Sequence, residues 1–269
     1  MEKLPVLTDV GVTRMRVLFF LIALISIKFL PADIIEVMRF EEIERYLEPD
    51  TLIILDIDNT LLEPIQELGT DQWFVHRRDW YEQQGYTSGE SLEMALAEWE
   101  AVQNITKVMA VERSTPGIVT QLQQKYIVMG MSTRGLALAT RTVYQLKDIG
   151  INLASASLTA EDVPLLNPQA ILFRKGILFT SGTHKGRALL KLFEQLHYTA
   201  KRIIFVNDKA THLREVEVAC EESHIPFIGL RYGFLDEKVK AFRSDIARVQ
   251  FENFKMILSD KEALNLIEH

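Results

Sequence analysis

Residues 52–60 read LIILDIDNT, in which four aliphatic side chains lead directly into two aspartates, an asparagine and a threonine. A continuous aliphatic run, without alternation of polar and apolar positions, predicts a strand that is buried on both faces. Such strands form the interior of parallel sheets. The stretch therefore predicts an α/β fold in which Asp56 and Asp58 directly follow a central strand.

Strands and helices alternate on either side of this stretch. Apolar runs predict further strands at 127–131, 171–173, 177–179, 203–206 and 227–230, the second and third joined as a hairpin. Amphipathic spacing predicts helices at 136–147, after residue 185 and after residue 212, and the composition of 33–47 also predicts a helix. This alternation implies right-handed crossover connections and a three-layer, Rossmann-like parallel sheet.

The overall composition narrows the classes of protein to which the chain can belong. Among its 269 residues, 48% are hydrophobic and 25% are charged, as in an ordinary globular protein. The net charge of −7 argues against a nucleic-acid binder, because phosphate backbones are bound by a surplus of lysine and arginine. The single cysteine, Cys220, excludes an intramolecular disulfide, and the six histidines lack the spacing of metal sites.

The N-terminal region carries the features of a targeting segment. Arg14 and Arg16 precede an apolar stretch at 17–27, which is shorter than the roughly 20 residues of a membrane-spanning helix but suits the core of a signal peptide. Residues 1–32 are therefore predicted to be a signal peptide or an N-terminal anchor that contacts a membrane, which favours export to the periplasm or secretion. The alternative is a buried N-terminal helix of a cytoplasmic protein.

Four groups of polar residues fall where predicted strands end or a predicted helix begins. They are Asp56 to Thr60, Ser132 with Thr133, Lys185, and Asn207 with Asp208. In open α/β sheets, the ligand site lies beyond the carboxyl ends of the strands. We therefore expect these groups to meet at one edge of the sheet and to form a binding site.

Together these side chains have the chemistry of phosphoryl transfer. One carboxylate can attack phosphorus and form an acyl phosphate, while a second one protonates the leaving oxygen and later activates water. Asp208 adds a third carboxylate and completes a set of oxygen ligands, which favours Mg²⁺. Lys185 and Mg²⁺ supply the positive charge that a phosphate needs among carboxylates, and the Ser132 hydroxyl can bind a phosphoryl oxygen. The predicted partner is a small phosphorylated substrate.

The four groups resemble, in order and spacing, the motifs of the haloacid dehalogenase-like (HAD) superfamily. Residues 56–60 resemble its first motif, aspartate-any-aspartate-any-threonine, and Ser132, Lys185 and Asp208 resemble the hydroxyl, the lysine and the acid of the next three. The resemblance covers residues 50–230. Within the superfamily, the sequence GILF at 176–179 followed by Lys185 is similar to that of an uncharacterised bacterial branch, known only as a domain of unknown function.

The resemblance implies a role for each matched residue. Asp56 would be the nucleophile and a metal ligand, Asp58 the acid and base with its backbone carbonyl on the metal, and Asp208 a further ligand of Mg²⁺. Ser132 or Thr133, together with Lys185, would bind the phosphoryl group. Because the residue two after the nucleophile is an aspartate, a phosphomonoesterase is favoured over a dehalogenase, with a phosphotransferase as an alternative.

The resemblance also implies a domain organisation. Residues 33–61 and 112–269 would form the HAD-like core, and 62–111, which is helical in composition and holds Trp73, Trp80 and Trp99, would be a small helical cap inserted after the first strand. Aromatic residues at helical spacing are more typical of packing than of substrate recognition.

Three residues extend or depart from the pattern. Thr60 closes the first motif, and Arg134 is a candidate for an additional phosphate contact. Asn207 stands where many HAD relatives carry a second acid, with Glu215 as the nearest acid beyond it. This departure motivates a second hypothesis, a catalytically weak exported protein that acts by binding.

Overall fold

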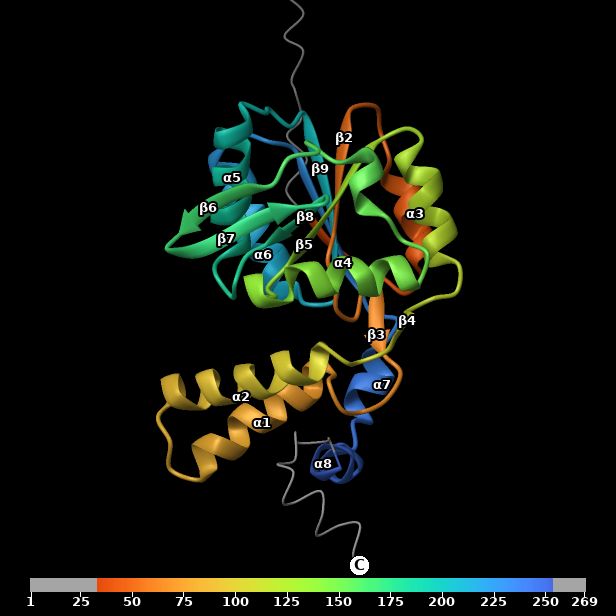
Figure 1. The fold of residues 1–269 in the computed structure, drawn as a ribbon. Coiled ribbons are helices and arrows are strands. Elements are labelled where there is room, and N and C mark those ends of the chain that lie inside the picture. Colours follow the sequence, from red (N-terminus) through yellow and green to blue (C-terminus); the bar gives the residue numbers. More distant parts are fainter. Residues whose placement is uncertain (1–32, 254–269) are drawn as a thin grey trace, which may run out of the picture.

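The computed structural model describes residues 33–253, which form an eight-stranded sheet with helices on both faces (Figure 1). The strands lie in the order β1 (Asp33–Val37), β10 (Phe227–Tyr232), β9 (Arg202–Asn207), β2 (Thr51–Leu55), β5 (Ile127–Ser132), β8 (Ile177–Phe179), β7 (Gln169–Arg174) and β6 (Val163–Asn167). The pairs from β1 to β8 are parallel, and β7 and β6 continue the sheet in antiparallel pairing. The predicted α/β fold class is confirmed.

The central strand β2 is buried on both faces because its alternate side chains enter two different core clusters. Ile53 and Leu55 pack in one cluster with Ile118 of α3, whereas Leu52 and Ile54 pack in the other. The first layer comprises η1 (Phe40–Tyr46), α3 (Thr115–Gln123), α4 (Ala139–Asp148) and η3 (Leu153–Ala156), and the second comprises α5 (Lys185–Leu196) and α6 (Ala210–Glu222). The short 3₁₀ helix η2 (Leu136–Leu138) buries Leu138 in a third cluster instead. The unbroken aliphatic run is thus the sequence of a strand between two helical layers.

Residues 33–47 do not form the predicted helix, and this prediction was wrong. Residues 33–37 are strand β1, which pairs in parallel with β10, and a 3₁₀ helix follows at Phe40–Tyr46. A short apolar run has no periodicity that separates a strand from a buried helix. The partner strand β10 decides between them, since it offers a free edge to which β1 hydrogen bonds.

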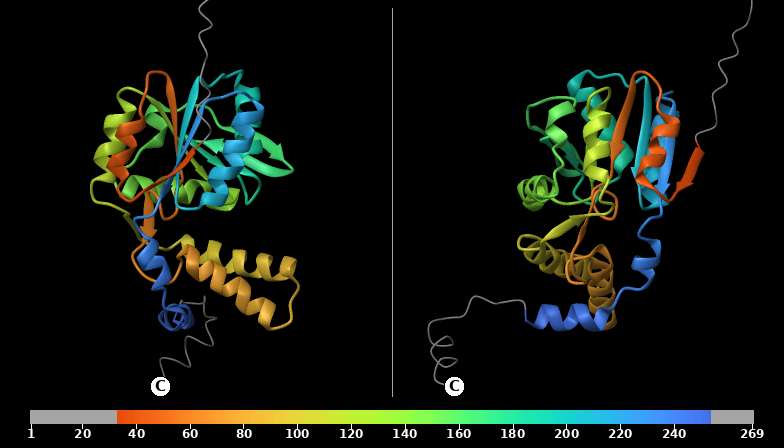
Figure 2. Two further views of the ribbon diagram at one scale, coloured as in Figure 1. Left: turned by 180° about the vertical axis from the view of Figure 1, so that it is seen from behind. Right: turned by 90° about the vertical axis from the view of Figure 1, so that its right-hand side faces the viewer.

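The segment 62–111 forms two antiparallel helices that lie apart from the sheet (Figures 1 and 2). Helix α1 (Asp71–Gln83) begins after Thr70, whose hydroxyl accepts a hydrogen bond from the Trp73 amide, and α2 (Ser88–Gln103) begins with a capping box at Thr87. The ends of the segment are not helical as predicted, because β3 (Leu62–Pro64) and β4 (Val108–Ala110) pair as an antiparallel ribbon.

The last described helices lie with this pair rather than with the α/β core. Helix α7 (Asp236–Lys240) leads away from the sheet, and α8 (Ser244–Glu252) packs against α1 and α2 (Figure 2). Trp73 and Trp99 are buried in this contact together with Ala247, so two of the three tryptophans serve packing. We use the name cap for α1, α2 and α8.

The predicted signal peptide or anchor, residues 1–32, lies outside the described residues. Among residues 33–253, no helix combines the length and the apolar character needed to cross a membrane.

Candidate active site

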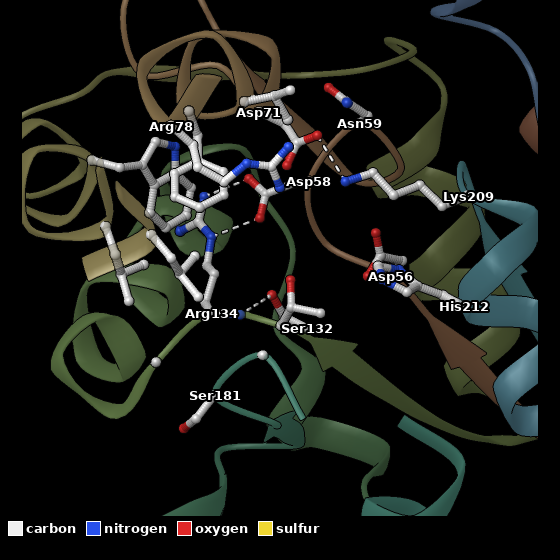
Figure 3. Close-up of a pocket in the computed structure, with 18 of the residues that line it drawn as sticks. Asp56, Asp58, Asn59, Asp71, Arg78, Ser132, Arg134, Ser181, Lys209 and His212 are labelled. Atoms are coloured by element: carbon white, nitrogen blue, oxygen red, sulfur yellow. Dashed lines mark hydrogen bonds and ion pairs between the residues drawn. The ribbon is translucent and has the colours of Figure 1, made fainter. Parts of the chain in front are cut away.

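The ends of three adjacent strands bring the predicted residues together. Strand β2 lies between β9 and β5, with Leu55 opposite both Val206 and Gly130, and the Asp56 amide continues the ladder by donating to the Val206 carbonyl at 2.9 Å. Asp56, Ser132 and Asp208 consequently line one cavity of about 780 Å³ between the core and the cap (Figure 3). These residues therefore meet at the carboxyl edge of the sheet, where we expected them from the sequence.

A tight turn after β2 aims the first motif into this cavity. Asn59 adopts a left-handed conformation with φ of 59°, which asparagine tolerates better than most residues, and its amide donates to the Leu62 carbonyl at 2.9 Å. The Asn59 side-chain amide donates to Asp208 at 3.3 Å and so links the first motif to the fourth. Thr60 is fully buried outside the cavity lining, and its hydroxyl has no partner among the described residues.

Lys185 lies beneath Asp56 and is fully buried. Its ammonium group donates to Asp56 Oδ1 at 2.5 Å and to the Met131 carbonyl at 3.3 Å. Lys185 is the first residue of α5, and its backbone amide donates to the Glu215 carboxylate of α6 at 2.7 Å. The chain therefore places a positive charge directly on the predicted nucleophile, and Glu215 fixes the end of the helix that carries it.

Two carboxylates of the cavity are pushed towards their protonated forms. Burial raises the pKa of Asp56, against the opposing charge of Lys185. Burial and the negative charge of Asp56 also raise the pKa of Asp208. Two neighbouring buried carboxylates repel each other and lack hydration, so a cation between them would stabilise both ionised forms.

Asp58 is held by Arg134, for which a phosphate contact had been predicted. Arg134 binds both carboxylate oxygens of Asp58, at 2.8 and 2.7 Å (Figure 3). Its remaining N–H groups donate to Thr142 and Gln145 of α4 and to Gln103 of α2. All five donors of the guanidinium group are thus used within the protein, which leaves none for a phosphate in this conformation.

Ser132 and Thr133 both lie at the cavity, as predicted from their place after β5. Ser132 is buried, and its hydroxyl accepts a hydrogen bond from the Arg134 amide at 3.2 Å. Thr133 is exposed and its carbonyl accepts from the Gly182 amide at 2.9 Å. Either hydroxyl is available to a ligand in the cavity.

Asn207 serves the turn rather than the cavity. Its side-chain oxygen accepts from the Lys209 amide at 2.8 Å, and it is fully buried outside the cavity lining. The fourth-motif group that reaches the cavity is Asp208.

The donor set fits magnesium. Within residues 33–253 no cluster of three or more histidine, cysteine, aspartate or glutamate side chains is arranged to hold a metal ion. Magnesium does not need such a cluster, because it commonly keeps several waters and binds one or two carboxylates together with a substrate phosphate. Asp56 and Asp208 line the same cavity and offer that kind of partial oxygen set.

Sequence reasoning did not find Asp71, Lys209 and His212, which also line the cavity. Lys209 forms an ion pair with Asp71 of the cap at 2.7 Å, and despite burial the charges of Asp71 and Asp208 raise the pKa of Lys209 (Figure 3). Burial lowers the pKa of His212 to about 3, so its imidazole is neutral at pH 7. Adjacency to Asp208 could have indicated Lys209, whereas Asp71 carries no local signal because the cap brings it there.

Comparison with solved structures finds hydrolases of the haloacid dehalogenase-like family, which the motifs resemble. One from Streptococcus pneumoniae is 11% identical with a TM-score of 0.42, covering 72% of this chain and 98% of that one. A Bacteroides thetaiotaomicron enzyme of the family, in complex with magnesium and inorganic phosphate, is 9% identical with a TM-score of 0.38, covering 66% and 92%.

Relatives in sequence cover nearly the whole chain. A protein of Chlamydia muridarum named "Putative outer membrane protein" is 28% identical over 261 residues, which are 95% of this chain and 98% of the relative. A protein of the same name from Chlamydia trachomatis serovar D is 26% identical over the same shares. A family model described as "Protein of unknown function (DUF2608)" matches residues 36–264. The chain belongs to the DUF2608 family.

Proposed function

We propose that the protein is a Mg²⁺-dependent phosphohydrolase that cleaves phosphomonoesters through an aspartyl phosphate on Asp56. The observation that carries the proposal is the buried Lys185 ammonium on the Asp56 carboxylate, at a strand end that opens into the same cavity as Asp58, Ser132 and Asp208. A buried lysine on a carboxylate at the floor of a cavity is a charge arrangement that suits a phosphoryl group.

The two catalytic carboxylates have different roles in the reaction. Lys185 binds Asp56 Oδ1, and Oδ2, which accepts no hydrogen bond from the described residues, attacks phosphorus. The bond between phosphorus and the leaving oxygen breaks, and protonated Asp58 supplies the proton for that oxygen. Asp58 then takes a proton from the water that hydrolyses the acyl phosphate, which regenerates Asp56 and releases inorganic phosphate.

Asp58 can do this only while Arg134 holds it at the cavity wall. The bidentate contact fixes the orientation of the carboxylate at the cavity wall, where the leaving group of a bound ester would lie. Protonation in the first step requires one of the two hydrogen bonds to lengthen. We therefore infer that Arg134 is a positioning residue for Asp58.

Magnesium would be held by Asp56, Asp208 and the Asp58 carbonyl, and it would offset the charge of the phosphate and of the clustered carboxylates. Asp208 keeps its place through the Asn59 amide, so the chain holds this carboxylate before any ligand binds.

Phosphate release from a broad panel of phosphomonoesters, with Mg²⁺ and with the metal chelated, tests the proposal. We expect release with Mg²⁺, its loss on chelation, and a decrease of at least about 10³-fold in kcat for Asp56→Asn, since that variant lacks the nucleophile. Arg187→Gln, an exposed change two residues beyond Lys185, is the control and should keep full activity. No Mg²⁺-dependent release across the panel contradicts the proposal.

A second candidate is a catalytically weak protein that acts by binding. The observation in its favour is that Arg134 occupies both oxygens of Asp58. Under this proposal, Asp56→Asn abolishes any residual phosphate release but leaves the phenotype of the wild-type protein in its host unchanged. Phosphotransfer, which needs the same residues, is recognised by transfer of labelled phosphate to added alcohols in preference to water.

We also propose that the protein is exported. The names of its chlamydial relatives and the apolar stretch 17–27 support this proposal. Fractionation of cells that express the full chain, with and without residues 1–32, tests it, because only the full chain should leave the cytoplasm.

A further inference from the structure

The cap presents apolar side chains to the cavity. Val75 of α1 and Leu92 and Leu96 of α2 line it, yet they are 37%, 47% and 38% exposed. Phe74 and the largely buried Trp99 add aromatic surface to the same wall. Exposed aliphatic side chains that gather in one concave region mark a ligand groove more often than a free surface.

Helical spacing makes this wall continuous. Leu92 and Leu96 are one turn apart on α2, and Val75 comes from the neighbouring helix, which packs antiparallel to it (Figure 1). These side chains are not needed to hold α1 and α2 together, because Trp73, Trp99 and Val102 form the core between the cap helices and α8. Val75, Leu92 and Leu96 are therefore not required for the packing of the cap.

The cavity is larger than a phosphoryl group requires. Its volume of about 780 Å³ lies within the range of roughly 300–1,000 Å³ that holds small organic ligands. Asp56, Asp208 and Ser132 occupy the end at the sheet, while the three aliphatic side chains, together with Asp71 and Glu93, come from the cap. A phosphate bound at Asp56 would leave the rest of its ester beside that wall.

The cations of the cavity already have partners. Arg78 contacts Asp79, Arg134 contacts Asp58, and Lys209 contacts Asp71. A leaving group with a second phosphate or a carboxylate would have to compete with these ion pairs. Among the described residues, every lysine and arginine that lines the cavity has a carboxylate partner, whereas the aliphatic side chains of the cap wall are exposed to the cavity.

We propose that the substrate is a phosphomonoester with an apolar leaving group, an alkyl chain or an aromatic ring that packs on Val75, Leu92 and Leu96. This proposal rests on the proposed function, because it takes the phosphate to bind at Asp56. The contact removes exposed aliphatic surface from water, and that burial is the source of affinity.

Binding of alkyl phosphonates of increasing length, from methyl to octyl, tests the contact without requiring turnover. Calorimetry on the full chain with Mg²⁺ should show Kd falling by up to about four-fold for each added methylene that reaches the wall. A Kd that is the same from methyl to octyl overturns the proposal.

Variants locate the contact. In the double variant Leu92→Gln with Leu96→Gln, the Kd for octyl phosphonate should rise by at least about 10-fold. The ratio of the Kd for octyl phosphonate to the Kd for methyl phosphonate should then approach one. Val218→Gln, which alters an equally exposed aliphatic side chain on α6 outside the cavity, should bind like the wild type. Equal effects of the two changes contradict the assignment of the wall.

Hydrolysis separates this proposal from the proposed function. If phosphate is released from glycerol phosphate and from octyl phosphate with equal kcat/KM, the phosphohydrolase stands and the apolar leaving group is wrong. If neither ester is cleaved but octyl phosphonate still binds more tightly than methyl phosphonate, the apolar contact stands and the hydrolase is wrong.

Discussion

Lys185 and Asp56 leave water together when the chain folds. The ammonium group is fully buried and the carboxylate nearly so, with 2.5 Å between Nζ and Oδ1. Removing two charges from water costs several kcal/mol each, and only their mutual attraction and further hydrogen bonds offset it. Each side chain therefore depends on the other for its stability as an ion.

Replacement of Lys185 should expose this dependence. Lys185→Met leaves the Asp56 carboxylate buried without its cation, and we expect the free energy of unfolding in urea to fall by about 3 kcal/mol. Lys201→Met removes an exposed ion pair with Asp50 and should leave the free energy of unfolding almost unchanged. The double variant Lys185→Met with Asp56→Asn should recover part of the free energy of unfolding that Lys185→Met loses. If the losses of the two single variants simply add, the two groups do not depend on each other.

At the scale of elements, the position of Lys185 depends on how closely α5 approaches α6. A Cβ added at Gly186 would lie 2.1 Å from the Glu215 carbonyl oxygen, so only glycine allows this contact. The same turn of α6 supplies the Glu215 carboxylate that accepts from the Lys185 amide. The packing of α5 against α6 therefore sets the position of Lys185 relative to Asp56.

Gly186→Ala should consequently reduce both stability and activity. The added methyl group forces α5 away from α6, which we expect to cost about 1–3 kcal/mol and to lower kcat as Lys185 shifts from Asp56. Gly117→Ala in α3 is the matched control: nothing lies within 4 Å of its added Cβ. This control should gain about 0.5–1 kcal/mol from helix propensity. Thermal unfolding together with phosphate release measures both effects, and a neutral Gly186→Ala contradicts the close approach.

At the scale of the whole molecule, buried ionisable groups outside the site link stability to pH. Burial raises the pKa of the Cys220 thiol from its ordinary 9.0 to about 12. The unfolded chain loses this proton first, so the contribution to stability is complete below pH 9 and is lost as pH rises towards 12. The thiol is thus a buried side chain of the core.

This linkage predicts how Cys220→Ala compares with the wild type in urea at pH 8 to 11. The variant should be less stable at pH 8, since it loses a buried sulfur, but the gap should narrow above pH 9 because alanine does not titrate. Val216→Ala, a deletion in the same buried cluster, should show a gap that does not change with pH. A constant gap for Cys220→Ala would mean that the folded thiol ionises as readily as the unfolded one.

Local sequence determines those elements whose stabilising interactions are made within a short segment of the chain. The run at 52–55 is aliphatic at every position and leads directly into turn residues, and the short run and the turn together favour a strand between two layers. The hairpin of 171–173 and 177–179 was predictable because its two apolar runs are separated by a short polar turn that ends in glycine. Thr70 and Thr87 start the cap helices through hydrogen bonds to their own neighbours.

Tertiary structure decides what depends on a distant partner. Residues 33–37 become a strand only because β10 presents an edge, and Arg134 turns to Asp58 because α2 and α4 supply its other acceptors. Asp71 reaches Lys209 across 138 residues of sequence. The sequence by itself determined the α/β sheet and the aspartates at its edge, because burial on both faces and tight turns are local properties. The neighbours of those aspartates and the apolar cap wall were decided by packing between segments that no local pattern connects.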